Sequence, residues 1–272
     1  TPQIIRQARS DLARRGGAEL TIPSVLTVWR DWNMVVFEGV VPPESHDGRT
    51  SSPIQLAQAA GNVLATLHDL SPGNLSAFTP TDELTATARW VELGALAGRM
   101  NAQSKRIWID VRKWRHRLPR SSGALIHRDF YDSQLLPTRQ GWAIVDFDTV
   151  ARGDREQDVG NFIGHLIWDS VRDGRSKAMW IEAAAALLES YERSRTTRKR
   201  IRRSAAINAA RLRFYLVSSM LRVGIIHGMR TGMRRPAQRL HDIADAFGRT
   251  SPMRLLALLR DAGFPSELRC LS

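Results

Sequence analysis

The spacing of hydrophobic positions changes twice along this chain of 272 residues. Apolar residues first recur every three to four positions, which predicts a helix over residues 2–15. Two apolar runs, Val25–Val28 and Met34–Val40, then predict strands joined by a turn at residues 30–33. From Ile54 onward the helical spacing returns and dominates. The pattern therefore predicts an α+β fold in which most of the chain is helical.

One stretch interrupts the helical part. The runs Leu125–His127, Leu135–Leu136 and Trp142–Asp146 are short and apolar, and they predict strands. The sequence PTRQG between the last two predicts the tight turn of a hairpin. A hairpin brings its two ends together, so the residues that flank these strands should lie close to one another.

The residues Pro42–Pro53 read PPESHDGRTSSP, a composition typical of a loop. This loop separates the opening helix and strands from the helical remainder. This loop is therefore the best candidate for a boundary in the first half of the chain, and the resemblance described below implies a partial N-terminal lobe over residues 1–42, made of a helix, two strands and a hinge. A helical C-terminal lobe with the central strands would then cover residues 43–272.

The central stretch also carries the candidate chemistry. Asp129 follows one apolar strand, Asp146 follows another, and Gln134 precedes the strand between them. Phosphoryl transfer needs a carboxylate that orients a hydroxyl, and hard oxygen ligands that hold magnesium against the phosphates. The alternative is that each aspartate caps a helix or closes a turn. The joint pattern of two aspartates, an amide and a hairpin favours phosphoryl transfer.

These residues resemble a known family. The stretch HRDFYDSQ, from His127 to Gln134, resembles the H-x-D-x-x-x-x-N catalytic loop of the aminoglycoside phosphotransferase and choline kinase-like enzymes, which share the protein-kinase fold. The segment IVDFDTVARGDREQDVGNF resembles their metal-binding segment, and LAQAAGNVLATLHDL and MVVFEGVVPPE are similar to a large-lobe helix and the hinge. The resemblance runs in the family's order from Val25 to Leu166. It implies a protein-kinase-like fold with a remnant of the small β-rich lobe and a large helical lobe.

The resemblance implies a role for each matched position. Asp129 would be the catalytic base, and His127 would brace the catalytic loop. Asp146 would be the main Mg²⁺ ligand, and Gln134, which stands where most members have Asn, would be the second. Asp148 could join the metal site or lie at its rim. The implied reaction moves the γ-phosphate of ATP to a hydroxyl of a small molecule.

The same resemblance places the nucleotide. The backbone of Glu38 and Val40 at the hinge would bind adenine, while Gln134 and Asp146 would hold the phosphates through magnesium. Asp158 would be architectural, as the cap of the helix that follows it.

Two parts of the family's nucleotide site are missing. Members carry a Gly-rich hairpin and a strand with a phosphate-binding lysine ahead of the hinge, whereas the first lysine here is Lys105. We therefore expect the chain to be an N-terminally truncated fragment that is a poor catalyst by itself. The alternative is a short relative that acts as a catalytically inactive, kinase-like binding module.

The charge suggests a third function. The net charge is +13 at pH 7, with 36 arginines and 4 lysines against 27 acidic residues. Such a balance can indicate nucleic-acid binding, but arginine replaces lysine throughout, as in GC-rich coding sequences, and we expect no specific nucleic-acid partner. The charge favours a neutral or anionic acceptor, such as a sugar, over an aminoglycoside. Side chains of the helical part could line its site, namely Trp168, Tyr191, Phe214, Tyr215 and His227.

The single cysteine, Cys270, excludes a disulfide framework and indicates a cytoplasmic protein. No apolar run approaches the roughly 20 residues that span a bilayer, so no membrane partner is expected. The expected partner is a small-molecule hydroxyl acceptor, and the sequence does not specify an oligomeric state.

Overall fold

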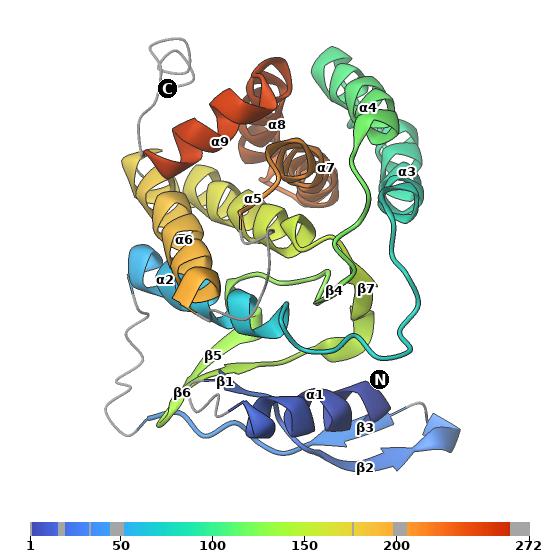
Figure 1. The fold of residues 1–272 in the computed structure, drawn as a ribbon. Coiled ribbons are helices and arrows are strands. Elements are labelled where there is room, and N and C mark those ends of the chain that lie inside the picture. Colours follow the sequence, from blue (N-terminus) through green and yellow to red (C-terminus); the bar gives the residue numbers. More distant parts are fainter. Residues whose placement is uncertain are drawn as a thin grey trace.

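A computed structural model describes residues 2–15, 20–32, 34–43, 52–175, 177–197 and 206–261. Among these residues, helices form the bulk of the molecule, and the short strands lie together at one end of it (Figure 1). Most of the loop predicted at Pro42–Pro53 and the C-terminal Cys270 fall outside the described residues.

The described part of residues 2–43 folds much as its apolar spacing predicts. Helix α1 spans Pro2–Arg14, and its apolar stripe, which includes Ile5 and Leu12, is buried. Strands β2 (Val25–Trp29) and β3 (Met34–Phe37) pair antiparallel around a short 3-10 turn. The predicted helix and hairpin are therefore confirmed, although the second strand ends earlier than Val40.

A three-stranded sheet holds the predicted central hairpin. Strands β5 (Leu135–Thr138) and β6 (Gly141–Ile144) pair antiparallel, so the hairpin is confirmed. Strand β1 (Leu20–Thr21), which the apolar pattern did not predict, adds to β6 in parallel. The sheet order is therefore β1-β6-β5, and it joins the N-terminal segment to the hairpin.

A second small pairing lies beside this sheet. Strand β4 (Ala124–Ile126) pairs antiparallel with β7 (Ala151–Gly153), which was also not predicted. The isolated bridge between Ala77 and Arg152 extends the pairing to the segment before α3. Strand β4, from which the residues His127–Asp129 continue, is thus held in place by its pairing with β7.

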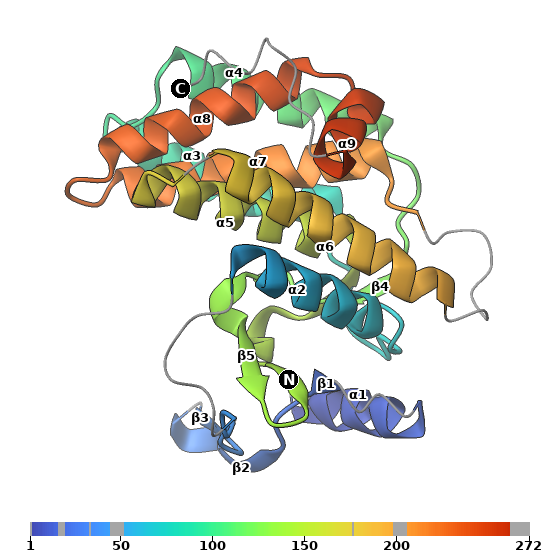
Figure 2. The ribbon, with the colours of Figure 1, turned by 90° about the vertical axis from the view of Figure 1, so that its left-hand side faces the viewer.

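Helix α1 lies at the strand end of the molecule beside β1, and the other helices lie in layers above the strands (Figure 2). These other helices are α2 (Pro53–Leu67), α3 (Pro80–Leu96), α4 (Ala102–Trp114), α5 (Glu156–Asp173), α6 (Lys177–Thr197), α7 (Ala209–Gly228), α8 (Arg234–Arg249) and α9 (Pro252–Arg260). Capping boxes begin two of them: Ser52 with Gln55 at α2, and Thr79 with Asp82 at α3. None of the helices within the described residues is long and apolar enough to cross a membrane.

Two glycines allow close helix packing in the core. At Gly61 of α2, an added Cβ would lie 2.0 Å from Ser190 Oγ on α6. At Gly160 of α5, it would lie 2.8 Å from the backbone nitrogen of Leu216 on α7. Any larger residue would force these helices apart, which costs packing energy in a dense interior. Gly61 therefore lets α2 pack closely on α6, and Gly160 lets α5 pack closely on α7.

Candidate functional site

The residues His127, Arg128 and Asp129 leave β4 in a sharp turn. Arg128 has a left-handed backbone, with φ of 74°, which is uncommon for a residue with a side chain. The carboxylate of Asp158 on α5 accepts hydrogen bonds from the backbone N–H of His127, at 2.8 Å, and of Arg128, at 2.7 Å. These two bonds fix the turn from which Asp129 projects.

A buried chain of polar groups supports Asp158. Its Oδ2 lies 3.0 Å from Nε2 of His68, and Nδ1 of the same ring lies 2.9 Å from the hydroxyl of Tyr191. The Asp158 carboxylate can only accept, so Nε2 of His68 donates to it, and in the neutral imidazole Nδ1 then accepts from the Tyr191 hydroxyl. The catalytic-loop turn is thus linked to α2 and α6 through His68 and Tyr191.

His127 connects the same turn to the far end of the hairpin. Its Nε2 lies 2.9 Å from the carbonyl oxygen of Val145, directly before Asp146. The ring is fully buried and packs against Phe130 and Phe147. Thr149 adds a hydrogen bond from its hydroxyl to the His127 carbonyl at 2.7 Å. His127 thus ties the Asp129 turn to the residue before Asp146, and the bracing role that the resemblance implies stays a prediction.

Gln134 and Asp146 lie next to each other across the hairpin. Nε2 of Gln134 is 3.5 Å from Oδ2 of Asp146, and the N–H of Val145 donates to the Gln134 carbonyl at 3.1 Å. Gln134 is buried, whereas Asp146 is exposed and has a left-handed backbone, with φ of 63°. Asp148, two residues on, is also exposed. The hairpin therefore presents an amide and a carboxylate side by side.

Tyr131 shows that Asp129 and Asp146 act on the same region. Burial raises the pKa of the Tyr131 hydroxyl, and the negative charges of Asp129, Asp132 and Asp146 raise it further, against a lowering by a hydrogen bond from Gln134. A single phenol can sense these carboxylates only if they lie around it. The candidate base and the candidate metal ligand thus share one electrostatic environment.

The hinge residues lie in a separate part of the candidate site. Glu38 follows β3, and its N–H donates to the Ser24 carbonyl at 2.8 Å. Hydrogen bonds from the hydroxyl and the backbone of Ser24 lower the pKa of the Glu38 carboxyl. Val40 is half-buried. Within the described part of the chain, no hydrogen bond joins Glu38 or Val40 to the central stretch, so their predicted nucleotide contacts stay predictions.

A pocket of about 150 Å³ opens beside the catalytic loop. Its lining includes Asp132, Leu166, Asp169, Arg172, Arg175 and Trp180. Asp169 on α5 pairs with Arg172 at 2.7 Å. Burial and the charge of Asp132 nevertheless raise the pKa of Asp169 from 3.8 to about 6. The pocket therefore holds carboxylates and guanidinium groups together. One of its carboxylates, Asp132, lies three residues after Asp129 in the chain.

The raised pKa of Asp169 predicts a pH-dependent stability. Folding raises this pKa, so the folded protein binds more protons than the unfolded chain, and stability is lost as pH rises from 3.8 through about 6. Asp169→Asn should remove this loss and stabilise the protein by about 1–2 kcal/mol near pH 8, allowing for solvent screening, with little effect near pH 3.5. Urea unfolding at both pH values measures the difference.

Asp173→Asn, on the same helix, is the matched control. Hydrogen bonds from Arg172 lower the pKa of Asp173, so this substitution should destabilise at neutral pH and not stabilise. Equal responses of the two variants would contradict the assignment to Asp169.

The aromatic residues predicted to line an acceptor site are mostly core residues. Trp168, Tyr191, Phe214 and Tyr215 are at most 2 % exposed. Only His227 is half-buried, and it stacks on Trp168 with ring centroids 4.3 Å apart. The four buried aromatic residues therefore belong to the packed core between the helices and do not line an acceptor site.

A stacked pair missing from those predictions lies nearer the catalytic loop. The ring of Tyr131 stacks on His165 at 4.6 Å. Burial, together with the charges of Arg222 and His227, lowers the pKa of His165 to about 3, so its imidazole is neutral at physiological pH. This pair places a flat, uncharged surface against the loop that carries Asp129.

The role predicted for Asp158 as a helix cap is wrong. Helix α5 begins at Glu156, so Asp158 lies within the first turn, and its oxygens bind the catalytic loop and His68. Asn161, one turn later, donates from Nδ2 to the Phe130 carbonyl at 3.1 Å. Asp158 and His68 are 90 positions apart, and no local spacing signals such a contact.

The side-chain oxygens at the hairpin can be compared with the ligands that Mg²⁺ requires. Among the described residues, no group of three or more His, Cys, Asp or Glu side chains is placed so that it could hold a metal ion by itself. Mg²⁺, however, commonly takes one or two protein oxygens and completes its shell with phosphate and water. The exposed Asp146 carboxylate and the adjacent Gln134 amide meet that requirement once the amide presents its oxygen.

Comparison with known proteins identifies the family. A model of the phosphotransferase enzyme family matches residues 25–202, more than half of the chain, so the chain belongs to that family. No curated protein sequence matches it. The family and the α+β, protein-kinase-like fold predicted from the sequence are therefore confirmed.

Solved structures agree on the fold. The choline/ethanolamine kinase family protein from Mesorhizobium loti superposes with a TM-score of 0.56 at 17% identity, covering 94% of this chain and 84% of that one. The aminoglycoside phosphotransferase from Alicyclobacillus acidocaldarius gives 0.54 at 15% identity, covering 96% and 83%. An aminoglycoside phosphotransferase in ternary complex with ADP and hygromycin B gives 0.53 at 19% identity, covering 90% and 82%.

Proposed function

We propose that this phosphotransferase moves the γ-phosphate of ATP to a hydroxyl group of a small molecule. The observation that carries the proposal is the juxtaposition at the hairpin. Asp129 leaves a turn braced by Asp158, and Gln134 and Asp146 lie 3.5 Å apart beside it. Phosphoryl transfer depends mainly on such positioned charges, since little covalent chemistry falls to the protein.

Each residue of the proposed centre has one task. Asp129 orients the acceptor hydroxyl and accepts its proton as the oxygen attacks phosphorus. Asp146 and Gln134 are the residues that would hold Mg²⁺, which neutralises charge on the phosphates when bound. His127 keeps the base and the metal side in register through its bond to the Val145 carbonyl. The hinge backbone at Glu38 and Val40 is the proposed adenine site.

We infer that the acceptor enters the pocket beside Asp132 and Asp169. It adjoins the catalytic loop, and its lining offers both hydrogen-bond acceptors and donors. That mixture suits an acceptor with several polar groups, such as a sugar or a hydroxyl-rich antibiotic. Of the neutral and anionic acceptors that the net charge favours, a purely anionic one would have to lie against two carboxylates.

A catalytically inactive binding module is the second candidate function. The specific observation behind it is that no lysine precedes Lys105, so a phosphate-binding lysine is absent from residues 1–104. An inactive module would keep the pocket and bind its small molecule without consuming ATP.

A turnover assay separates the two functions. ADP release from MgATP should rise in the presence of one compound from a panel of sugars, amino alcohols and aminoglycosides, and the product should carry a phosphate detectable by mass spectrometry. Because the chain is expected to be a poor catalyst by itself, the assay needs protein and MgATP concentrations at which slow turnover is detectable. Binding of a panel compound without any ADP release under those conditions would favour the binding module over the enzyme.

A further inference from the structure

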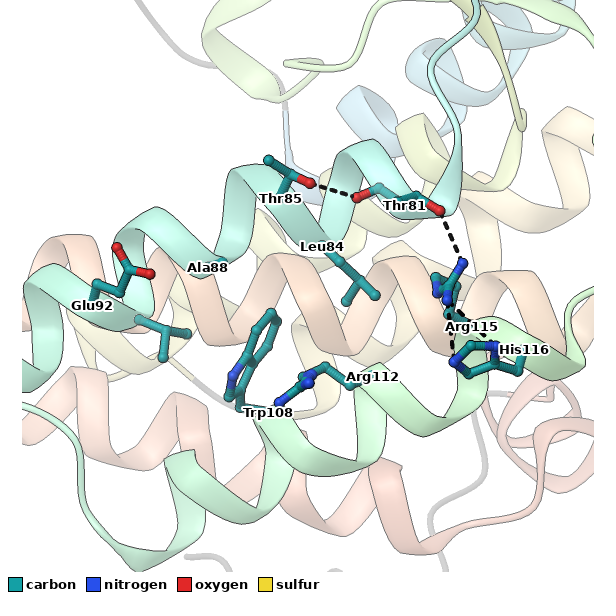
Figure 3. A pocket seen from close by; sticks show the side chains of 10 residues that line it. Thr81, Leu84, Thr85, Ala88, Glu92, Trp108, Arg112, Arg115 and His116 are labelled. Atoms are coloured by element: carbon teal, nitrogen blue, oxygen red, sulfur yellow. Dashed lines mark hydrogen bonds between the residues drawn. The ribbon is translucent and has the colours of Figure 1, made fainter.

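A groove of about 500 Å³ separates helices α3 and α4, away from the hairpin (Figures 1 and 3). The α3 wall is one helical face, because its lining residues recur at three- and four-residue spacing. The opposite wall continues from α4 into the 3-10 turn Arg115–Arg117. We call this space the α3–α4 groove; the side chains that the argument uses are Leu84, Ala88, Val91, Trp108, Arg112 and Arg115.

The middle of the groove is apolar. Leu84, Ala88 and Val91 of α3 and Trp108 of α4 line it, and all four are only partly buried. Figure 3 shows Leu84 and Ala88 on the side of α3 next to Trp108. Apolar side chains collected along two helices without a covering element are typical of an interaction surface.

The α4 side of the groove is basic. Arg112 lies over the Trp108 ring, 5.8 Å from its centroid, and Arg115 donates to the Thr81 hydroxyl at 3.1 Å. Within the part of the chain that the structure describes, neither guanidinium pairs with a carboxylate. Glu92 is the single acidic residue of the lining, and Figure 3 places it at the opposite end from Arg115.

We propose that the α3–α4 groove binds an acidic amphipathic helix of a partner protein. A helix laid between two helices inserts its apolar stripe at three- and four-residue spacing, which the α3 wall matches. Acidic residues beside that stripe would pair with Arg112 and Arg115. Nucleic acid suits the groove poorly, because its backbone needs cations along the whole track and Glu92 stands at one end.

The test uses a fluorescent peptide of about 18 residues with leucines on one helical face and glutamates on both sides of them. We expect it to bind the full chain with a Kd of about 1–50 µM. Arg112→Glu combined with Arg115→Glu should weaken binding about tenfold or more. Trp108→Ala should also weaken it, and circular dichroism and thermal melting establish that each variant is folded.

Three controls decide the outcome. Arg6→Glu, on the exposed side of α1, makes the same charge change elsewhere and should leave the Kd within about twofold. A peptide with lysine in place of glutamate, and one with its leucines scrambled, should not bind. The proposal is overturned if the acidic peptide fails to bind, if Arg6→Glu weakens binding equally, or if an oligonucleotide competes for the same groove. None of these results bears on the proposed phosphate transfer.

Discussion

Asp129→Asn should lower kcat for phosphate transfer by about 10²–10⁴-fold, with little change in the affinity for MgATP. The substitution keeps the shape of the side chain and removes its ability to accept a proton. Asp158 binds the backbone of His127 and Arg128, not the Asp129 side chain, so the turn should stay in place. Steady-state kinetics on the compound identified by the panel measures kcat, and calorimetry measures nucleotide binding.

Asp31→Asn is the control for this experiment. Asp31 is an exposed carboxylate in the turn between β2 and β3, and its loss should leave kcat unchanged. Turnover by Asp129→Asn within about tenfold of the parent would mean that another group accepts the proton. A parallel fall in nucleotide affinity would instead point to a structural effect.

The second large effect is on stability. Asp158→Ala should destabilise the fold by about 3–5 kcal/mol, because it leaves two backbone N–H groups and His68 Nε2 without their buried acceptor. Asp158→Asn keeps one acceptor oxygen and should cost less. The left-handed backbone of Arg128 adds to the loss, since the bonds that hold it are removed. Urea unfolding gives the free energies.

A double-mutant cycle tests whether His68 acts through Asp158. His68→Phe should be destabilising in the parent and clearly less so in the Asp158→Ala background, where its partner is already gone. Additive costs would show that the two side chains stabilise the fold independently. The variant Glu189→Ala, at an exposed position of α6, should leave stability within about 0.5 kcal/mol.

Much of the fold followed from local apolar spacing. In α1 and in the β5–β6 hairpin, the spacing of apolar residues within the element itself indicates the type of structure. The two strands that were missed, β1 and β7, are two and three residues long, too short to show any alternation. Such strands form only because a partner strand is already in place.

The candidate site also has a part that could be predicted from the sequence and a part that could not. Asp129, Gln134 and Asp146 could be picked out because they flank short apolar strands, which places them near one end of a hairpin. The hydrogen bonds that hold the Asp129 turn could not be predicted from the sequence. Asp158 reads as a cap when only its neighbours are considered, and its contact with His68 arises from the packing of α2 beside α5. Long-range hydrogen bonds of this kind have no signature in spacing.

The parallel pairing of β1 with β6 has a mechanical consequence. Leu20 and Thr21 are joined to Trp142 and Ala143, a few residues before Asp146. A rotation that carried the end of α1 and β1 away from the helices would have to tear backbone bonds beside Asp146. If a nucleotide binds at the hinge as proposed, the movement that admits it would fall to the β2–β3 ribbon, which pairs with no other strand among the described residues.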